Sequence, residues 1–284
     1  MYEIEIKDMD MNQIAVSGQC FRIRRQPDCD AVWSVTANGE YVEAVQQGNR
    51  FLFSCNQEVF DNHWSLYFDL SRDYGQIKKE IDPEDAYLQE AVKAGWGVRI
   101  LRQDLWEMIV TFLISQNNNI TRITNSVEAL AVKFGQKKNS RGLIRYDGEN
   151  WQETDREFYT FPDPQQIAQG GMEALQGLGL GYRDKYILDM AQFCSSQEGR
   201  NWLTQLLDCD YEESHKRLMT RYGIGRKVAD CICLFGLHHV GAFPVDTHVK
   251  QIVAAYYPGG FPLDQYPGIA GILQQYMFYY KLNK

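Results

Sequence analysis

A lysine and an aspartate near the C-terminal end of the chain have the types and the spacing of a reacting pair. Lys227 lies in "YGIGRKVADCICLFGL" (222–237), and Asp246 lies in "GAFPVDTHVKQI" (241–252). The N-terminus of a helix carries partial positive charge, which disfavours a cation in the first helical turn. The ammonium group of Lys227 therefore either reaches out to solvent or functions without its proton.

The elements around this pair can bring the two side chains together. A helix that begins at Gly225 would end near Gly236, and "LHHVGAFPV" can return the chain toward the start of that helix. Asp246 directly precedes the next predicted helix, where a carboxylate caps free N–H groups even without any chemical role. We expect Lys227 and Asp246 to meet at the mouth of one cleft.

Two glycines shape the turn before Lys227. Gly223 and Gly225 allow positive φ and a close approach of another backbone. The N–H groups that open the next helix would then point outward and could bind a phosphate. The alternative is a plain corner between two helices, in which the glycines only end the first helix.

Six segments resemble a known family in the order of its own blocks: "SGQCFR", "ISQNNNITRI", "GLGLGYRDKY", "KVADCICL", "PVDTH" and "AGILQQYMF". They span nearly the whole chain and are similar to 8-oxoguanine DNA glycosylases, which belong to the helix-hairpin-helix-Gly/Pro-Asp superfamily. The sequence departs from the family at Ile23, where an aromatic residue is common, and at Tyr222, where the hairpin often has proline. Its overall acidity is a third departure.

The resemblance implies a bifunctional DNA glycosylase and AP lyase that removes 8-oxoguanine from duplex DNA. Lys227 would attack C1′ of the sugar and form a Schiff base, which leads to strand nicking by β-elimination. Asp246 would stabilise the developing positive charge and orient the lysine. Burial and the helix end would lower the pKa of a lysine, whereas a nearby carboxylate would raise it, so the sequence leaves the balance open.

The resemblance also implies a pocket for a flipped base. Phe278 and Cys231 would sandwich the base, and Gln274 would bond its pairing edge. Gly18 would offer its carbonyl oxygen to the N7 hydrogen, which 8-oxoguanine has and guanine lacks. Cys231 lies four residues after Lys227, on the same face of the predicted helix. Taken alone, Gln274 and Phe278 are more typical of an amphipathic terminal helix than of a base pocket.

Four residues are implied at the gap that the flipped base leaves in the duplex. Tyr182 would enter this gap, and three other residues would contact the orphaned partner base: Asn117, Arg122 and Arg183. Arginine and asparagine carry donors that suit base edges. The alternative places them on a helix surface or makes them hydrogen-bonding residues of the core.

Phosphate and metal contacts are implied at the hairpin and beside Asp246. Gly223 and Gly225 would present backbone N–H groups to a phosphate, and His248 would touch a phosphate unless it is a structural histidine. The family often holds a metal ion at the hairpin through backbone carbonyls, which here would be those of Met219, Arg221 and Ile224. We expect no required cofactor.

Charge by itself argues against a nucleic-acid partner, because the net charge is −8 and the pI is about 5.2. The basic residues nevertheless gather in three segments without acids: 11–27, 131–146 and 215–229. Acids concentrate elsewhere, for example in "DGENWQETDREF". We expect the basic segments to converge on one face that binds damaged double-stranded DNA.

The 7 cysteines are odd in number and include no C-x-x-C pair, so neither disulfides nor an iron–sulfur cluster is expected. No stretch is long and apolar enough for a membrane span, and the polar start "MYEIEIKDMD" has no secretory signal. We expect a cytoplasmic, nucleoid-associated monomer with no membrane partner.

Hydrophobic periodicity predicts an α+β fold. Residues 1 to about 70 alternate with period two and contain the hairpin signal Asn38-Gly39, which indicates antiparallel strands. Helical spacing follows, interrupted at 136–160 by a polar stretch that is typical of a loop. We divide the chain into an N-terminal antiparallel β domain at 1–95 and a helical helix-hairpin-helix domain at 96–284.

Two other functions compete with this interpretation. The first is a glycosylase for alkylated bases, a branch that generally lacks the lysine. The second is a helix-hairpin-helix module that binds DNA without chemistry, although phosphate binding alone requires neither Lys227 nor Asp246.

Overall fold

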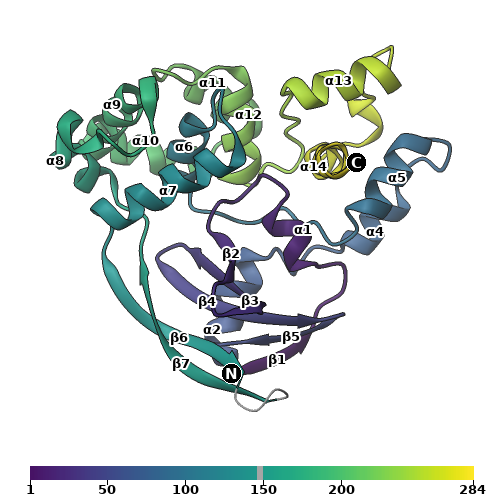
Figure 1. Cartoon of the computed structure of the whole chain (residues 1–284). Coiled ribbons are helices and arrows are strands. Elements are labelled where there is room, and N and C mark those ends of the chain that lie inside the picture. Colours follow the sequence, from purple (N-terminus) through teal and green to yellow (C-terminus); the bar gives the residue numbers. More distant parts are fainter. Residues whose placement is uncertain (146–149) are drawn as a thin grey trace.

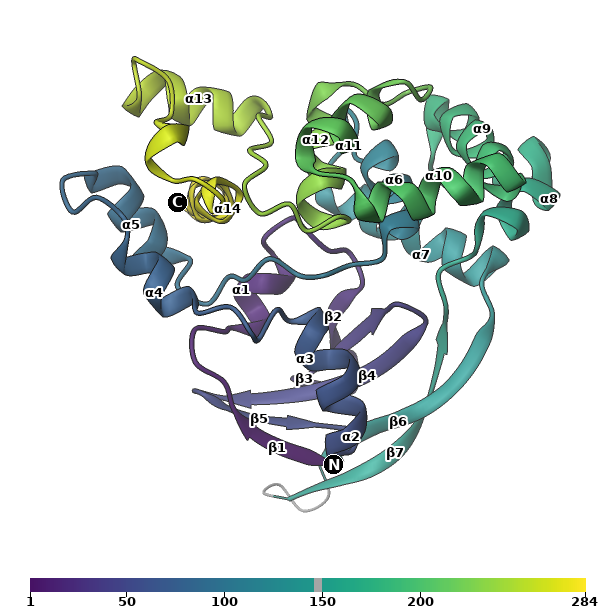
Figure 2. The same cartoon turned by 180° about the vertical axis from the view of Figure 1, so that it is seen from behind.

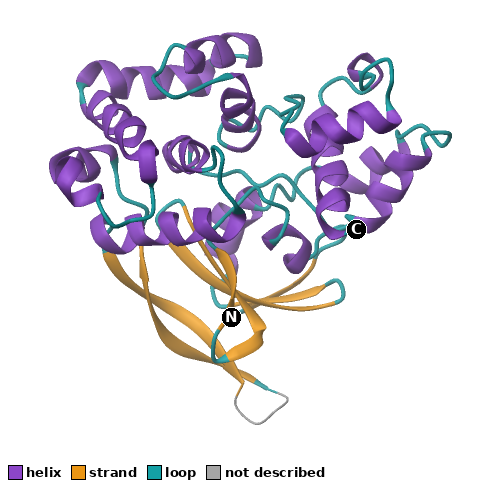
Figure 3. Ribbon diagram, turned by 45° about the horizontal axis from the view of Figure 1, so that its top comes forward, coloured by secondary structure: helices purple, strands orange, loops and turns teal. Residues whose placement is uncertain are grey.

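The computed structural model describes residues 1–145 and 150–284 and shows the predicted α+β architecture. Strands lie on one side of the molecule and helices on the other (Figure 3). Five strands form an antiparallel sheet in the order β1-β5-β4-β3-β2. Their bounds are Tyr2–Glu5 (β1), Ile23–Gln26 (β2), Cys29–Ala37 (β3), Glu40–Gln47 (β4) and Arg50–Phe53 (β5).

The predicted hairpin at Asn38-Gly39 joins β3 to β4. Asn38 has φ of 52° and Gly39 has φ of 77°, and the flanking residues Ala37 and Glu40 pair across the turn. Two successive positive φ values give the tight two-residue turn whose twist suits antiparallel strands. This local prediction is confirmed.

The predicted run of strands to about residue 70 is wrong, because the last strand of the sheet ends at Phe53. Helical turns follow as α2 (Gln57–Val59), η1 (Phe60–Trp64) and α3 (Ser65–Tyr67). Phe60, Trp64 and Tyr67 are buried, and this spacing of four and three residues is that of a helix. The segment packs its aromatic side chains against the sheet's apolar face.

The polar stretch predicted as a loop at 136–160 is also different, because it forms a long two-stranded hairpin. β6 (Lys137–Arg145) pairs antiparallel with β7 (Trp151–Tyr159), and Figure 1 shows both strands reaching down from the helices onto the sheet. Most of its side chains face water, so apolar alternation is weak. Opposite charges take its place, as in the Arg141–Asp155 ion pair of 2.7 Å between directly paired residues.

This hairpin is attached to the sheet at one buried carboxylate. Glu43 of β4 is fully buried and accepts hydrogen bonds from the Leu143 backbone N–H, from Tyr41 and from the Arg156 guanidinium, the last at 2.8 Å. Leu143 packs beside it against Val32 and Val45. The β6–β7 hairpin therefore covers a second face of the sheet and connects it to the helical part.

The described chain contains further helices and short helical turns. Those outside the predicted helix-hairpin-helix region are α1 (Met11–Ala15), α4 (Tyr74–Lys79), α5 (Ala86–Ala94), α6 (Leu105–Ile114), α7 (Ile120–Phe134), α8 (Pro164–Leu175), η2 (Gly181–Arg183), α9 (Asp184–Ser195), α10 (Gln197–Asp208), η3 (Leu263–Gln265) and α14 (Ala270–Asn283). The site adds α11 (Tyr211–Met219), α12 (Arg226–Phe235) and α13 (Thr247–Tyr256).

Figures 1 and 2 show two groups of helices above the sheet, one formed by α6 to α12 and the other by α4, α5, α13 and α14. Helix α5 packs against α14, although the two are far apart in sequence. Side chains of α4 and α5 accordingly share the large core of the helical part, including Ile77 and Leu88. The proposed division of the chain at residues 95 and 96 stays a prediction.

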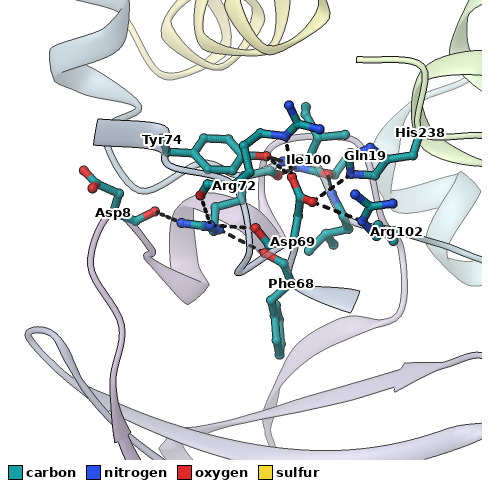
Figure 4. A network of polar contacts seen from close by, with 11 residues as sticks. Asp8, Gln19, Phe68, Asp69, Arg72, Tyr74, Ile100, Arg102 and His238 are labelled. Atoms are coloured by element: carbon teal, nitrogen blue, oxygen red, sulfur yellow. Dashed lines mark hydrogen bonds and ion pairs between the residues drawn. The ribbon is translucent and has the colours of Figure 1, made fainter. Parts of the chain in front are cut away.

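A buried aspartate ties the sheet region to the loop that follows α12 (Figure 4). Asp69 has φ of 51°, and its carboxylate pairs with Arg72 at 2.8 Å and Arg102 at 3.0 Å. Tyr74 donates a hydrogen bond to it at 3.1 Å, and Nε2 of His238 lies 3.5 Å away. Burial raises the pKa of Asp69, but His238 and Arg72 outweigh it, so the pKa lies well below its usual range.

Arg99 reinforces the same junction. Its buried guanidinium donates only to backbone carbonyls, and its carbon Cζ lies 4.1 Å from the centre of the Tyr74 ring. The acceptors are the carbonyl oxygens of Lys7, Asp8, Phe68, Asp69 and Arg72. The buried Asp69 carboxylate and the buried Arg99 guanidinium therefore have the hydrogen bonds that buried charges require.

Candidate active site and DNA-binding cleft

The predicted helix-hairpin-helix is present as α11, a turn at 220–225, and α12. Gly223 has φ of +84°, and a Cβ atom there would lie 2.6 Å from the ring of Tyr186. Only glycine fits this position. Gly225 differs from the prediction, because its φ is −94° and a Cβ would meet nothing within 4 Å.

Gly225 instead serves as the N-cap of α12 without any side-chain cap. The first N–H groups of α12 are therefore left free of a capping side chain, and partial positive charge gathers at this end. Arg226 is exposed next to it. This is the anion-binding geometry that the sequence predicts at the hairpin.

Lys227 and Asp246 line the same cleft, as predicted from their spacing. Both side chains are half-buried, and together they border an open cleft of about 560 Å³. Asp246 is the N-cap of α13 and accepts the Val249 N–H at 2.8 Å. Nζ of Lys227 lies 5.6 Å from the centre of the Phe112 ring. The carboxylate thus has one backbone donor, and the two charged groups form no ion pair in the described part of the chain.

A smaller cavity of about 50 Å³ opens beside this pair. Every residue predicted to contact the flipped base lines this cavity. Its lining residues are Gly18, Phe112, Lys227, Cys231, Phe235, Pro244, Asp246, Gln274, Gln275 and Phe278. Oε1 of Gln274 is buried without a hydrogen-bond partner. An unpaired buried acceptor costs free energy, so this oxygen is available for a donor on a ligand.

Gly18 and Phe278 lie against one another in the lining of this cavity. Gly18 has φ of +76°, and a Cβ atom would lie 2.9 Å from Cε1 of Phe278. Gln275 donates a hydrogen bond to the carbonyl of Ser17, which fixes the backbone next to Gly18. The His248 ring meets Phe278 edge to face at 5.9 Å, which places the predicted phosphate-binding histidine at the cavity mouth.

Cys231 is suited to be an apolar wall of the cavity. Burial raises the pKa of its thiol to about 11, although the charge of Lys227 and a hydrogen bond from Lys227 lower it. A thiol with this pKa stays neutral at pH 7, and a neutral thiol is a small polarizable hydrophobe. Cys231 therefore contributes contact area to the cavity wall.

The other wall of the cleft comes from residues 115–118 before α7, and Tyr182 of η2 contacts this wall at Asn117. Asn117 is exposed with φ of 45°, and its Nδ2 donates to the Tyr182 hydroxyl at 3.3 Å. Arg122 is exposed in the first turn of α7. Tyr182 is 44% exposed, and Arg183 lies beneath it with Cζ 4.6 Å from the ring centre.

Arg183 has partners that the sequence did not reveal. Its buried guanidinium donates to the carbonyls of Gln116, Asn117 and Leu180, which uses four of its five N–H groups. It holds the loop that carries Asn117. These bonds leave one further N–H group on Arg183, so its contact with the orphaned base stays a prediction. The side chain of the exposed Arg122 makes no hydrogen bond or ion pair within residues 1–145 and 150–284.

The expected convergence of three basic segments is only partly present. Segment 215–229 supplies Arg226 and Lys227 to the cleft. Segment 131–146 instead contributes Lys137 and Arg141 to ion pairs within the β6–β7 hairpin. Tyr146, the last residue of this segment, lies outside the described residues. The same holds for Asp147 and Glu149 of the acidic segment "DGENWQETDREF".

Segment 11–27 also differs from the prediction, because Arg22 is buried against Glu128 at 2.9 Å. The cleft gains a further basic residue from Lys250 of α13, with Asp246 as the one acid among its lining residues. Residues close in space but distant in sequence therefore make this surface basic.

Several lining residues were not identified from the sequence. Phe112 and Phe235 stack at 5.4 Å under the cavity, and Pro244 and Gln275 complete its wall. Phe112 and Phe235 occupy apolar positions of helices, which are indistinguishable from core positions before the cavity is known. Pro244 could have been identified from the sequence, because it lies two residues before Asp246 in the segment "PVDTH".

The predicted metal ligands lie in the hairpin turn. The Arg221 carbonyl accepts the Ile224 N–H at 3.1 Å and keeps its second lone pair, while Met219 ends α11. Carbonyl oxygens are suitable ligands for hard cations. Within residues 1–145 and 150–284, no group of three or more His, Cys, Asp and Glu side chains is placed to hold a metal ion.

Comparison with known families agrees with this geometry. A profile of the 8-oxoguanine DNA glycosylase N-terminal domain matches residues 1–109, and a profile of HhH-GPD superfamily base excision DNA repair proteins matches residues 110–259. The chain belongs to the 8-oxoguanine DNA glycosylase family of this superfamily. The resemblance stated from the sequence segments is confirmed.

Individual relatives extend the comparison. An N-glycosylase/DNA lyase of Saccharomyces cerevisiae is 33% identical over 212 residues, which cover 71% of this chain and 53% of the relative. The chain spans about half the length of the curated relatives that it matches first. MBOgg1, solved in complex with a low affinity DNA ligand, is 35% identical with a TM-score of 0.85, covering 99% of this chain and 95% of that chain.

A second solved structure is the 8-oxoguanine glycosylase/lyase of Clostridium acetobutylicum in complex with double-stranded DNA containing cytosine opposite to 8-oxoG. It is 32% identical with a TM-score of 0.84, and the superposition covers 98% of this chain and 93% of that chain. Nearly the entire described fold is thus shared with this family. No helix in the described part of the chain is long and apolar enough to cross a membrane.

Proposed function

We propose that this protein is a bifunctional base-excision repair enzyme, a DNA glycosylase and AP lyase that removes 8-oxoguanine from duplex DNA. The observation that carries the proposal is that Lys227 and Asp246 border two sites at once. One is the open cleft, and the other is the cavity lined by the unpaired Oε1 of Gln274. The cleft suits a DNA backbone, and the cavity suits one extruded base.

Base recognition follows from the polar and aromatic groups around the cavity. The Gln274 oxygen accepts a hydrogen from the pairing edge, and the carbonyl of Gly18 accepts the N7 hydrogen of 8-oxoguanine. Phe278 and the Cys231 thiol contact the two faces of the base. The cavity of about 50 Å³ is smaller than a purine, so the Phe278 ring must move away from Gly18 to admit the base.

The proposed chemistry uses Lys227 and Asp246. Neutral Nζ of Lys227 bonds to C1′ while the bond from C1′ to N9 breaks, and the base leaves with that electron pair and then takes a proton. Opening of the sugar ring gives a Schiff base. Removal of a C2′ proton then expels the 3′ phosphate, which nicks the strand. Asp246 faces C1′ as positive charge develops there.

Borohydride trapping tests this function. Duplex DNA with 8-oxoguanine, incubated with the protein and borohydride, is expected to give a covalent adduct that mass spectrometry places on Lys227. An adduct on another lysine would remove Lys227 from the mechanism, and no adduct with bound 8-oxoguanine DNA would favour a binding module. Faster excision of an alkylated base than of 8-oxoguanine would favour the alkylated-base branch.

We propose that no cofactor takes part in the reaction and that a cation bound by the carbonyls of Met219, Arg221 and Ile224 would only stiffen the hairpin turn. Excision that persists in a chelator, with weaker DNA binding, is the expected outcome. Loss of the chemical step itself at saturating DNA would contradict this role.

We also propose a monomer that works in the cytoplasm on nucleoid DNA. The cleft and cavity are complete within one chain, so the reaction requires no second copy. Light scattering in solution, and a fluorescent fusion viewed with stained DNA, test the two parts of this proposal.

A further inference from the structure

Three tyrosines form a continuous row from the gap-filling position to the hairpin. The Tyr182 and Tyr186 rings meet edge to face at 5.9 Å and 83°, and the Tyr186 and Tyr222 rings meet at 4.7 Å and 85°. Tyr182 is 44% exposed and Tyr222 is 54% exposed, whereas Tyr186 lies half-buried between them. Two exposed rings therefore share one inner ring as their support.

The inner ring is also the surface on which the hairpin turn rests. A Cβ atom on Gly223 would lie 2.6 Å from Tyr186, so the turn's backbone lies against this ring. Tyr186 projects from the first turn of α9, directly after the η2 turn that carries Tyr182. One side chain thus contacts both the hairpin that faces phosphate and the residue that enters the base gap.

Tyr222 itself has an exposed position beside the uncapped N-terminus of α12. It lies three residues before Gly225, the N-cap, and next to Gly223 in the turn. A phenol at this place can donate a hydrogen bond to a phosphate and lay its ring edge on a deoxyribose. The sequence departs here from the proline that is often found in the family.

We propose that Tyr182, Tyr186 and Tyr222 act as one DNA-contacting ridge, in which Tyr222 binds the sugar–phosphate backbone and Tyr186 is a positioning residue that sets Tyr182 at a constant distance from the bound phosphate. This proposal rests on the proposed glycosylase function. It adds two roles to the proposed site. Tyr222 contacts the DNA backbone, and Tyr186 acts as a spacer that positions Tyr182.

The first experiment measures binding to duplex DNA that carries a stable abasic analogue. Tyr222→Leu is expected to weaken binding about two- to tenfold, the range of one lost hydrogen bond. Tyr256→Leu is the matched control, because Tyr256 is 51% exposed and stacks on Tyr87 at 4.1 Å. Equal affinity of Tyr222→Leu and wild type, with the control also unchanged, would overturn the backbone contact.

The second experiment tests the spacer by single-turnover excision of 8-oxoguanine at saturating protein. Tyr186→Leu is expected to slow excision at least about tenfold, because a small displacement of a positioning group has large kinetic effects. Tyr186→Phe retains the ring and is expected to restore the wild-type rate. A melting curve of each variant shows how much of the protein is folded.

A double-mutant cycle separates positioning from general packing. In a Tyr182→Leu background, Tyr186→Leu is expected to have little further effect, because the residue that it positions is gone. Additive losses in the cycle would overturn the spacer role. Absence of excision and trapping by the wild type would instead contradict the proposed glycosylase function, so the two failures are distinguishable.

Discussion

Two aspartates in this molecule lie in opposite surroundings. Asp69 at the junction between sheet and helices is fully buried and is contacted by two arginines, a tyrosine hydroxyl and His238. Asp246 at the cleft is half-buried and accepts one backbone N–H, with Lys227 nearby but unpaired. The first carboxylate is saturated, and the second keeps unused acceptor capacity.

The same contrast separates other polar groups of the two regions. Arg99 at the junction donates to five carbonyls, whereas Oε1 of Gln274 in the cavity has no partner. Buried polar groups that are fully bonded stabilise a fold, and leaving one unpaired costs stability. The unpaired oxygen of Gln274 lines the cavity and is therefore available to a donor on a ligand.

The largest effect on chemistry is expected at Lys227. Lys227→Gln removes the nucleophile, so excision and borohydride trapping should fall to background. Binding to 8-oxoguanine DNA and the melting temperature should remain close to wild type, because Lys227 forms no ion pair with any residue of 1–145 or 150–284. Gel-based excision, trapping and anisotropy measure the three properties. Residual trapping in this variant would show that another amine can serve.

The largest effect on stability is expected at Asp69. Asp69→Asn leaves Arg72, Arg102 and His238 without their buried counter-charge, which should reduce the free energy of unfolding by about 3 to 5 kcal/mol. Denaturant unfolding measures this loss. The excision rate per folded molecule should stay within about twofold of wild type, in contrast to the cleft variants.

Asp69 also predicts a pH dependence. Its pKa is lower in the folded protein than in the unfolded chain, so its contribution to stability is fully present above about pH 4 and disappears as the pH falls through the folded value. The stability difference between wild type and Asp69→Asn should therefore decrease as the pH is lowered from about 5 toward 3. A difference that increases as the pH falls through this range would contradict the assigned direction.

Asp246→Asn should act mainly on the rate. A preorganised charge that faces a developing cation contributes about 3 kcal/mol to the barrier, whereas weaker capping of α13 costs about 1 kcal/mol of stability. Single-turnover kinetics and a melting curve measured on the same preparation separate these effects. An unchanged rate would leave Asp246 with capping alone.

The smallest effect is expected at Arg122, which contacts the opposite base in our proposal. Its exposed side chain contrasts with the guanidinium of Arg183, which donates to backbone carbonyls. An unpaired cytosine offers acceptors at O2 and N3, whereas adenine places an amino donor in the way, so excision should be faster opposite cytosine. Arg122→Ala should reduce this preference by about 1 to 3 kcal/mol without loss of stability. Single-turnover excision from four duplexes that differ in the opposite base measures it.

Arg183→Ala is the matched variant for that experiment. Its guanidinium is saturated by backbone carbonyls, so we expect a lower melting temperature and a weaker rate with every opposite base. A loss confined to the cytosine duplex would show that Arg183 reads the base despite its internal bonds.

Local signals in the sequence predicted several features of the backbone around the site. Asp246 caps a helix, Gly223 takes a positive φ, and Lys227 and Cys231 share one helix face, all within a few residues of backbone. The resemblance placed Gly18, Gln274 and Phe278 together, and the cavity contains all three. Short-range geometry depends on residue type and spacing, which are fully present in a sequence.

Long-range partners were decided only by the tertiary structure. The polar β6–β7 hairpin is held to the sheet by buried Glu43, which lies a hundred residues from Leu143 in the chain. Asp69 depends on His238, and Arg183 on the carbonyls near residue 117, in the same way. A charged side chain has the same appearance in a sequence whether it will be saturated or left free. Its role is determined by groups that only folding brings within hydrogen-bonding distance.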